Sequence, residues 1–192
     1  TVAGARNSQA VVPVKVYGFT NVVTFQFAMH WNTNVVAFKS LDLSTLSGLT
    51  TNSFGISDVG AGVLRVSWDD PAGAGKTLAD ETAVFGVRFE LVGTNGTSSA
   101  VTIDATPIAI EASASSGGIV AAVPVGVQAG QVTVVNSVQL AGKVTYYAGD
   151  RGVPEVGVTL SGGLTNAVTT GNEGSFSFVV SPGANYTVTP AK

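Results

Sequence analysis

The 192-residue sequence contains no cysteine. Without a thiol, the chain cannot form a disulfide, a thiolate zinc site or an iron–sulfur cluster, and it has no cysteine nucleophile. Histidine occurs only once, as His30. A Ser-His-Asp site needs that histidine beside a serine and a carboxylate, and a zinc site would otherwise rest on carboxylates alone. We therefore expect a protein that is not an enzyme and that needs no cofactor.

Charged residues are also scarce. They make up 11% of the chain, against roughly 25% in an average soluble protein. No cluster of Lys and Arg is present to neutralise phosphates, which argues against a nucleic-acid partner. No apolar run approaches the roughly 20 residues of a membrane-spanning helix, so membrane insertion is not expected, and the chain starts in what looks like mature sequence without a signal peptide. Many Thr, Ser and Asn residues favour a secreted or cell-surface location.

The residues that are abundant favour β-strands joined by turns, with 24 glycines among many Val, Thr and Ser residues. The clearest strand is the stretch TFQFAMHWN at 24–32, in which large apolar residues fall on every second position. That set is Phe25, Phe27, Met29 and Trp31. Since successive side chains on a strand point to opposite faces, His30 is expected on the outward face with Gln26.

The same alternation predicts further strands at 10–17, 35–43, 63–68, 83–92, 100–104, 108–112, 119–123 and 131–135. Pro13 places the first of these at a sheet edge or a bulge. Many short strands with glycine-rich turns are typical of an all-β sandwich. From about Gln139, four or more short strands separated by GDRG and GNEG turns indicate a second, smaller unit. We predict domains at 1–136 and 137–192, joined by a short linker.

Five segments of the first domain resemble a cohesin, the receptor module of bacterial cellulosome scaffoldins. They are VVPVKV (11–16), FQFAMHWNTNVVAF (25–38), WDD (68–70), AVFGVRFELV (83–92) and GQVTVV (130–135). The resemblance implies a nine-stranded jelly-roll sandwich without catalytic activity, which binds a dockerin through one flat sheet face and leaves calcium on the dockerin. The start TVAG is shorter than in that family. A short first strand leaves an edge to which another chain could add a strand.

The second domain resembles carboxypeptidase regulatory-like and Cna-B-like modules. The matching segments are GKVTY (142–146), GVPEVGVTLSG (152–162), TTGNEGSFSF (169–178) and PGANYTVTP (182–190). The resemblance implies a small prealbumin-like or Ig-like β-sandwich that acts as a spacer. Cna-B-like domains often crosslink a lysine to an asparagine beside an acid, which makes Lys143, Asn185 and Glu155 candidates for an isopeptide bond. The alternative is that all three are surface residues.

The cohesin resemblance implies a partner face on one sheet, which we assign to the strands at 23–31, 63–68 and 83–92. The outward positions of those strands are Thr24, Gln26, Ala28, His30, Arg65, Ser67, Asp69, Val84, Gly86, Arg88 and Glu90. Small residues on such a face would let a helix approach closely, while Arg88 and Glu90 would set register and specificity.

Two other groups of residues have competing interpretations. Asp69 and Asp70 could form an acid pair for glycoside hydrolysis, a calcium site, or a turn before Pro71 in which an aspartate bonds its own backbone. The aromatic residues could form a sugar-stacking platform or belong to the core. They are Trp31, Trp68, Tyr17, Tyr146, Tyr147 and Tyr186.

Three functions follow from these observations. The first is recognition of a protein partner, possibly a dockerin module, in a secreted or surface assembly. The second is a structural subunit of a surface filament or adhesin that self-assembles by strand exchange. The third is a carbohydrate-binding module.

Overall fold

The computed structural model describes residues 1–43, 46–180 and 184–192. The chain divides into two compact units, Thr1–Val134 and Val135–Lys192, and each is considered by itself. The predicted linker at 136–138 falls at the start of the second unit. Pro182 and Gly183, from the PGANYTVTP segment, lie outside the described residues. Within the described ranges no helix is long and apolar enough to cross a membrane.

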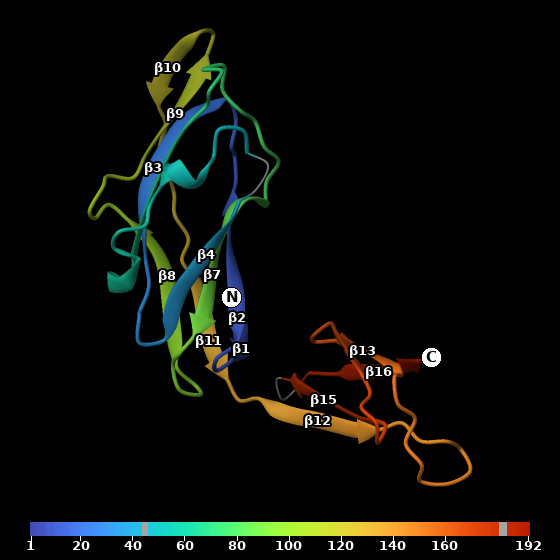
Figure 1. Cartoon of the computed structure of the whole chain (residues 1–192). Coiled ribbons are helices and arrows are strands. Elements are labelled where there is room, and N and C mark those ends of the chain that lie inside the picture. Colours follow the sequence, from blue (N-terminus) through green and yellow to red (C-terminus); the bar gives the residue numbers. More distant parts are fainter. Residues whose placement is uncertain (44–45, 181–183) are drawn as a thin grey trace. The chain divides into compact units, whose positions relative to one another are not determined.

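The first unit is a sandwich of two sheets (Figure 1). The smaller sheet has the order β2-β7-β4, with bounds Gln9–Val16, Thr82–Leu91 and Val36–Leu43. The larger sheet runs β1-β11-β8-β3-β6-β5, with bounds Val2–Ala5, Gly130–Val135, Ser98–Asp104, Val22–His30, Val63–Asp69 and Phe54–Gly55. Two further strands, β9 (Glu111–Ser116) and β10 (Ile119–Ala122), extend it, because β9 pairs with both β3 and β10. Two short 3₁₀ turns, η1 (Thr51–Ser53) and η2 (Val59–Ala61), flank β5.

The predicted alternation is visible in the core between these sheets. On β3, Phe25 and Met29 are buried, and the Phe25 ring stacks on Trp68 of β6 with a centroid distance of 5.1 Å. From the other sheet, β7 contributes Phe85 and Phe89, which are almost fully buried. Burying one such side chain contributes about 1.5–3 kcal/mol, so this alternation is what holds the two layers together.

The second unit contains two small sheets around a core of its own. One pairs β12 (Val138–Lys143) with β15 (Ser175–Val180), and the other has the order β14-β13-β16. The bounds of these three strands are Asn166–Thr169, Gly157–Gly162 and Tyr186–Ala191. Val158 and Leu160 from β13 pack in one cluster with Phe178 and Val180 from β15. The two sheets therefore face each other across a shared apolar layer.

The prediction of an all-β sandwich fold is confirmed. Pro13 lies on β2, an edge strand of the smaller sheet, as its missing N–H requires. The strands of the first unit are numbered to β11 because β1 and the two-residue β5 add to the nine strands that the sequence indicated.

Candidate partner-binding face

The outward residues predicted on β3 and β6 lie together on the larger sheet. The two strands are antiparallel, and the register places Gln26 opposite Ser67 and Ala28 opposite Arg65. Thr24 is opposite Asp69 at one end of the row, while at the other end His30 is opposite Val63. Side chains that are directly opposite share a face, so these residues form one surface. We call it the β3–β6 face.

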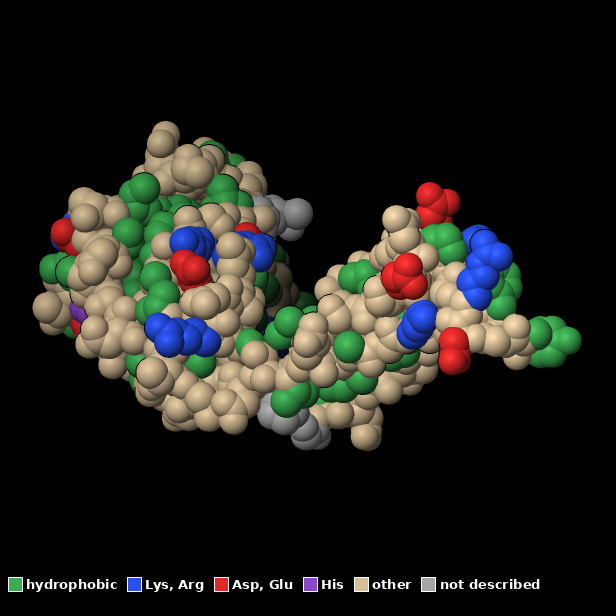
Figure 2. Space-filling view, turned by 60° about the horizontal axis from the view of Figure 1, so that its bottom comes forward, with side chains coloured by type: hydrophobic (Ala, Val, Ile, Leu, Met, Phe, Trp, Pro, Cys, Tyr) green, Lys and Arg blue, Asp and Glu red, His purple; other side chains and the backbone are tan. Residues whose placement is uncertain are grey.

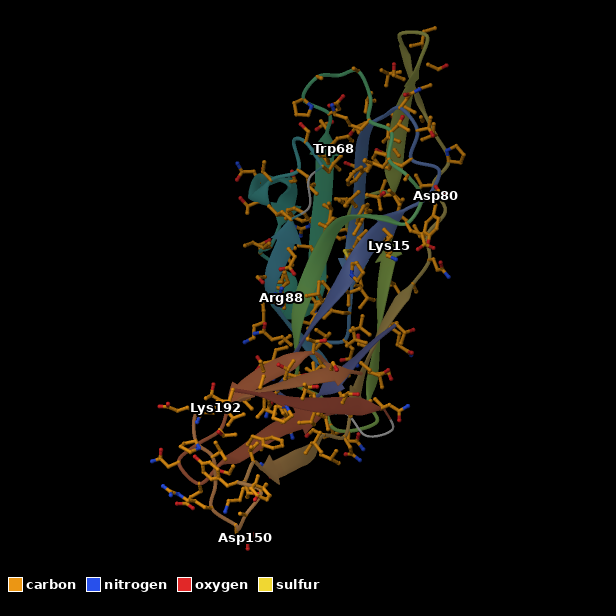
Figure 3. The ribbon with its side chains drawn as sticks, turned by 90° about the vertical axis from the view of Figure 1, so that its right-hand side faces the viewer. Lys15, Trp68, Asp80, Arg88, Asp150 and Lys192 are labelled. Atoms are coloured by element: carbon orange, nitrogen blue, oxygen red, sulfur yellow. The ribbon has the colours of Figure 1, made fainter. Side chains whose placement is uncertain are left out.

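The expectation that β7 shares this face was wrong. Val84, Gly86, Arg88 and Glu90 lie on β7, which pairs with β2 and β4 in the opposite sheet. Figure 3 labels Arg88 on β7 and Trp68 on β6, strands of different layers. Alternation within a strand defines two faces, but it does not say which sheet a strand joins, and consecutive strands of a jelly roll cross between sheets.

Val84 also departs from its predicted outward position. The pairing of β2 with β7 shifts register between Val14 and Lys15, so that Val14 is opposite Phe85 whereas Lys15 is opposite Ala83, and the extra residue on β7 is Val84. A bulge of this kind turns two successive side chains toward the same side. Val84 and Phe85 are accordingly both buried. Arg88 and Glu90 do point outward, but they form ion pairs with Asp42 and Lys39 of the neighbouring β4.

Arg65 is the positively charged residue at the centre of the β3–β6 face. Its guanidinium forms an ion pair with Asp58, which lies just before η2. Gly55 on the neighbouring β5 is opposite Arg65, and a Cβ on that glycine would lie 3.3 Å from the Arg65 Cβ. The glycine therefore leaves room for the arginine to lie along the sheet. Ala28, between Arg65 and Asp104 in the register, has no exposed surface and forms the floor of the face.

His30 is fixed by oxygen atoms rather than placed for catalysis. Its Nε2 lies 2.6 Å from the Thr106 carbonyl oxygen and 3.1 Å from Asp104 Oδ1. Asp104 in turn accepts a hydrogen bond from the Thr106 backbone N–H. None of these contacts involves the serine that a nucleophilic triad would need. The histidine is a partly exposed polar residue at the margin of the β3–β6 face, where Figure 2 shows its purple side chain next to a red acid.

Sequence reasoning missed the acids around this face. Asp104 at the end of β8 is opposite Ala28, and Glu111 on β9 accepts a hydrogen bond from Gln26. Together with Asp58 and Asp69 they give the face more acids than bases. Asp104 could have been expected on the same face as Thr102, because the two residues are two positions apart on the predicted strand 100–104. The pairing of both β8 and β9 with one edge of β3 could not be inferred from alternation.

Asp70 organises the loop after β6. Its carboxylate accepts hydrogen bonds from the backbone N–H groups of Ala72, Ala74 and Gly75, and it forms an ion pair with Lys76. Burial raises the pKa of the Asp70 carboxyl, but the amides of Gly75 and Ala72 and the Lys76 ammonium outweigh this, so the pKa lies below its ordinary value.

These contacts favour the turn interpretation of the Asp69–Asp70 pair. The oxygen atoms of Asp70 are already occupied by backbone donors and a lysine, whereas Asp69 points outward on β6. In the described part of the chain, no group of three or more His, Asp or Glu side chains could hold a metal ion. The structure therefore gives the weak calcium hypothesis for Asp69 and Asp70 no support.

The isopeptide candidates are not brought into a buried site. Lys143, Glu155 and Asn185 are all exposed. The Lys143 Nζ donates a hydrogen bond to the Asp150 carbonyl oxygen, at 2.9 Å. Lys143 lies on β12, whereas Asn185 precedes β16, which belongs to the other sheet. The geometry favours the alternative, in which they are surface residues.

The two tryptophans do not form a sugar-stacking platform. Trp31 and Trp68 are 7% and 1% exposed and belong to the core of the first unit. The exposed aromatic side chains are Tyr17 in the first unit and Tyr146 and Tyr147 in the second. Tyr146 is covered by the Arg151 guanidinium, 5.9 Å from the ring centroid, and Tyr186 is partly buried against the second core.

No family model matches the sequence, and no curated protein is similar enough to match it. Several solved structures are nevertheless similar in fold. The sixth cohesin of scaffoldin B from Acetivibrio cellulolyticus, solved with a dockerin, is 22% identical with a TM-score of 0.55, and the match covers 70% of this chain and 94% of that one. A type I cohesin–dockerin complex from Clostridium thermocellum is 12% identical with a TM-score of 0.56, with the same coverages.

A third similar structure is a non-cellulosomal cohesin from the archaeon Archaeoglobus fulgidus. It is 22% identical to this chain, with a TM-score of 0.53, and the match covers 71% of this chain and 87% of that one. At such identities the likeness concerns the fold. The two-sheet sandwich of this protein is thus the fold that is shared by cohesin domains from bacteria and an archaeon.

Proposed function

We propose that the first unit is a protein–protein recognition module that binds a dockerin-type partner through the β3–β6 face. The observation that carries the proposal is the combination of a cohesin fold with an open sheet face on β3 and β6. Several of the structures similar in fold are cohesins in complex with dockerins, including two of those described above. The proposal assigns no catalytic role to the chain.

The side chains of the β3–β6 face suit a helical partner. Ala28 forms the floor, Gln26 and Ser67 add short polar groups, and the Arg65 side chain lies beside Gly55. A flat face lined by small residues allows a helix to pack closely, and the polar groups around it then select register.

The charges on the β3–β6 face indicate which charges a partner should carry. The face carries Asp58, Asp69, Asp104 and Glu111 around Arg65 and His30. In the view of Figure 2, most of the surface is uncharged and the blue and red side chains occupy only a small part of it. A partner with Lys or Arg beside its apolar contact would complement this face, and attraction between exposed charges is screened by salt. Association should therefore be slower at high ionic strength.

We assign the second unit to a spacer role and the whole chain to a secreted or cell-surface assembly. The second unit has its own core, centred on Val158 and Leu160. Among its described residues, Lys143 bonds the Asp150 carbonyl oxygen and Tyr146 is covered by Arg151, so neither adds to a shared binding site. Few charges and many hydroxyl side chains support the location.

The test is size-exclusion chromatography with light scattering of the full chain, alone and with candidate dockerins, with and without calcium. We expect a one-to-one complex that forms only with calcium, because the dockerin carries the ion. The informative variant is Ser67→Tyr, which places a large ring on the β3–β6 face and should weaken binding by about tenfold or more.

Ser40→Tyr is the matched control, because Ser40 is also an exposed strand serine but lies on β4 in the opposite sheet. It should bind as the unsubstituted chain does. Equal weakening by both variants would place the contact elsewhere, and failure to bind any dockerin in calcium would reject the proposal.

A further inference from the structure

The β9–β10 hairpin ends the larger sheet with an open edge. β9 pairs with β3 on one side and with β10 on the other, which makes β10 the outermost strand (Figure 1). The hairpin turn is Gly117–Gly118, with φ of 59° and 81°. Positive φ at both central residues belongs to a two-residue type I′ turn, which glycine adopts without strain. A tight turn therefore connects β9 to β10, and the side of β10 that faces away from β9 forms the open edge.

The hydrogen-bond pattern shows which backbone groups of β10 are unpaired. Beyond the strand, the Val123 N–H donates to the Ala112 carbonyl oxygen, at 2.9 Å. Hydrogen-bonded pairs alternate along an antiparallel ladder, so Ile119 and Ala121 also bond toward β9. The N–H and C=O groups of Val120 and Ala122 must then point to the open side.

Within its four residues, β10 has no lysine, proline or bulge, whereas other edge strands of this unit carry such protection. On the smaller sheet, β2 carries Pro13 and Lys15, and β4 has an irregularity at Lys39. On the larger sheet, β5 is only two residues long. Short edges, lysines, prolines and bulges all hinder the addition of another strand.

In contrast, β10 reads IVAA, and residues 112–142 contain no charged side chain. Ile119 and Val120 are 72% and 56% exposed. Uncharged, β-branched residues on an open edge favour pairing with another strand.

We propose that β10 pairs antiparallel with β10 of a second copy of this chain, across a two-fold axis that passes beside Ala121. In this register Val120 and Ala122 of one copy exchange backbone hydrogen bonds with Ala122 and Val120 of the other. Sliding the strands to centre on Ala122 would bring Val120 opposite Pro124, which has no N–H to donate. The proline therefore disfavours that register, and sliding the other way, to centre on Val120, would bring Ala122 opposite Gly118 in the hairpin turn, which leaves the register centred on Ala121.

A second copy fits this edge because the edge is complementary to itself. In the same register Ile119 lies opposite Val123 of the second copy, so apolar side chains meet on both sides of the axis. A charged residue close to the axis would lie near its own like-charged counterpart in the second copy, and the strand has none. The pairing joins the two larger sheets into one and does not depend on the dockerin proposal.

The first test uses the absence of cysteine. Ala121→Cys places one thiol in each copy beside the axis, where Cα atoms of a non-hydrogen-bonded pair lie about 4.5 Å apart. A disulfide needs Cα atoms within about 7 Å, so mild oxidation should crosslink the dimer. Ile119→Cys is the control, because the two thiols would be separated by about 13 Å. Mixing Ile119→Cys with Val123→Cys should restore the crosslink. Equal crosslinking of Ala121→Cys and Ile119→Cys would overturn the proposed register.

The second test is the dimer dissociation constant of the full chain, from sedimentation equilibrium. Val120→Pro removes only an N–H that points outward, so the hairpin keeps its own bonds, and the dissociation constant should rise about tenfold or more. Val125→Pro, in an exposed segment outside the pairing, should leave it unchanged. A chain that stays monomeric at all concentrations overturns the proposal. The proposal is also overturned if the chain is a monomer and Val120→Pro abolishes its binding to another protein, because the edge would then pair with a strand of that protein.

Discussion

The two tryptophans of the first unit differ by one hydrogen bond. Trp68 Nε1 donates to the Ser47 carbonyl oxygen at 2.9 Å. Trp31 Nε1 is also buried, but among the described residues it has no acceptor. A buried donor without a partner keeps its desolvation cost, whereas a bonded one recovers it. The same side chain therefore contributes differently to stability at these two positions.

We expect Trp68→Phe to lower the free energy of unfolding more than Trp31→Phe does. Both changes remove similar ring volume, but only the first breaks a hydrogen bond, and the second removes an unpaired N–H. The difference should be about 1–2 kcal/mol, measured by urea unfolding at equilibrium. Equal losses would mean that the Trp31 indole nitrogen finds a partner in solution.

At the scale of elements, the loop that follows β6 depends on one ionised carboxylate. Asp70 accepts three backbone hydrogen bonds within the loop and an ion pair from Lys76, and its pKa lies below the ordinary value. The unfolded chain therefore binds a proton on Asp70 more readily than the folded chain does. The stability that this carboxylate adds is complete above its ordinary pKa and is lost as pH falls toward its native pKa.

We expect Asp70→Asn to make the free energy of unfolding depend less on pH in the acid range. In the unsubstituted chain, the urea midpoint should drop as pH falls below about 4, the ordinary value for aspartate, and this drop should be smaller in the variant. Asp69→Asn, at the exposed neighbouring position, is the control and should keep the original profile. If the urea midpoint of Asp70→Asn falls with pH as much as that of the unsubstituted chain, the role of this carboxylate is contradicted.

The strands could be predicted from the sequence because alternation reports burial within one strand. The stretch around Phe25 and Met29 became β3 with the expected inward side chains. The predicted strand at 108–112 instead begins at Glu111, after the segment around Pro107 has interrupted the pairing along β3. The sheet to which β7 belongs depends on long-range pairing, which alternation does not encode. Four of the eleven residues predicted on the partner face, those on β7, therefore lie on the other sheet.

For the whole molecule, two separate cores imply two stabilities. The second unit has a small core in which Leu160 has no exposed surface. Small domains bury a lower fraction of their surface and are only marginally stable. Loss of this core should leave the sandwich of the first unit, and the β3–β6 face with it, intact.

We therefore expect Leu160→Ala to unfold the second unit without affecting partner binding. Removing a buried leucine costs about 2–5 kcal/mol, which is a large share of the stability of so small a domain. Calorimetry should show the transition of the second unit lowered or absent, while that of the first unit is unchanged. Val87→Ala, in the core of the first unit, is the matched control and should shift the other transition. A single transition that moves as one in both variants would contradict this independence.

The uncharged stretch that contains β10 also determines how the chain can be cut. Between Arg88 and Lys143 there is no lysine or arginine, and between Glu111 and Lys143 there is no acid. The division between the units, after Val134, falls inside both intervals. Trypsin and glutamate-specific proteases therefore have no cleavage site at the junction, even when it is fully accessible. Separating the two units at this junction takes an enzyme that cleaves after uncharged residues.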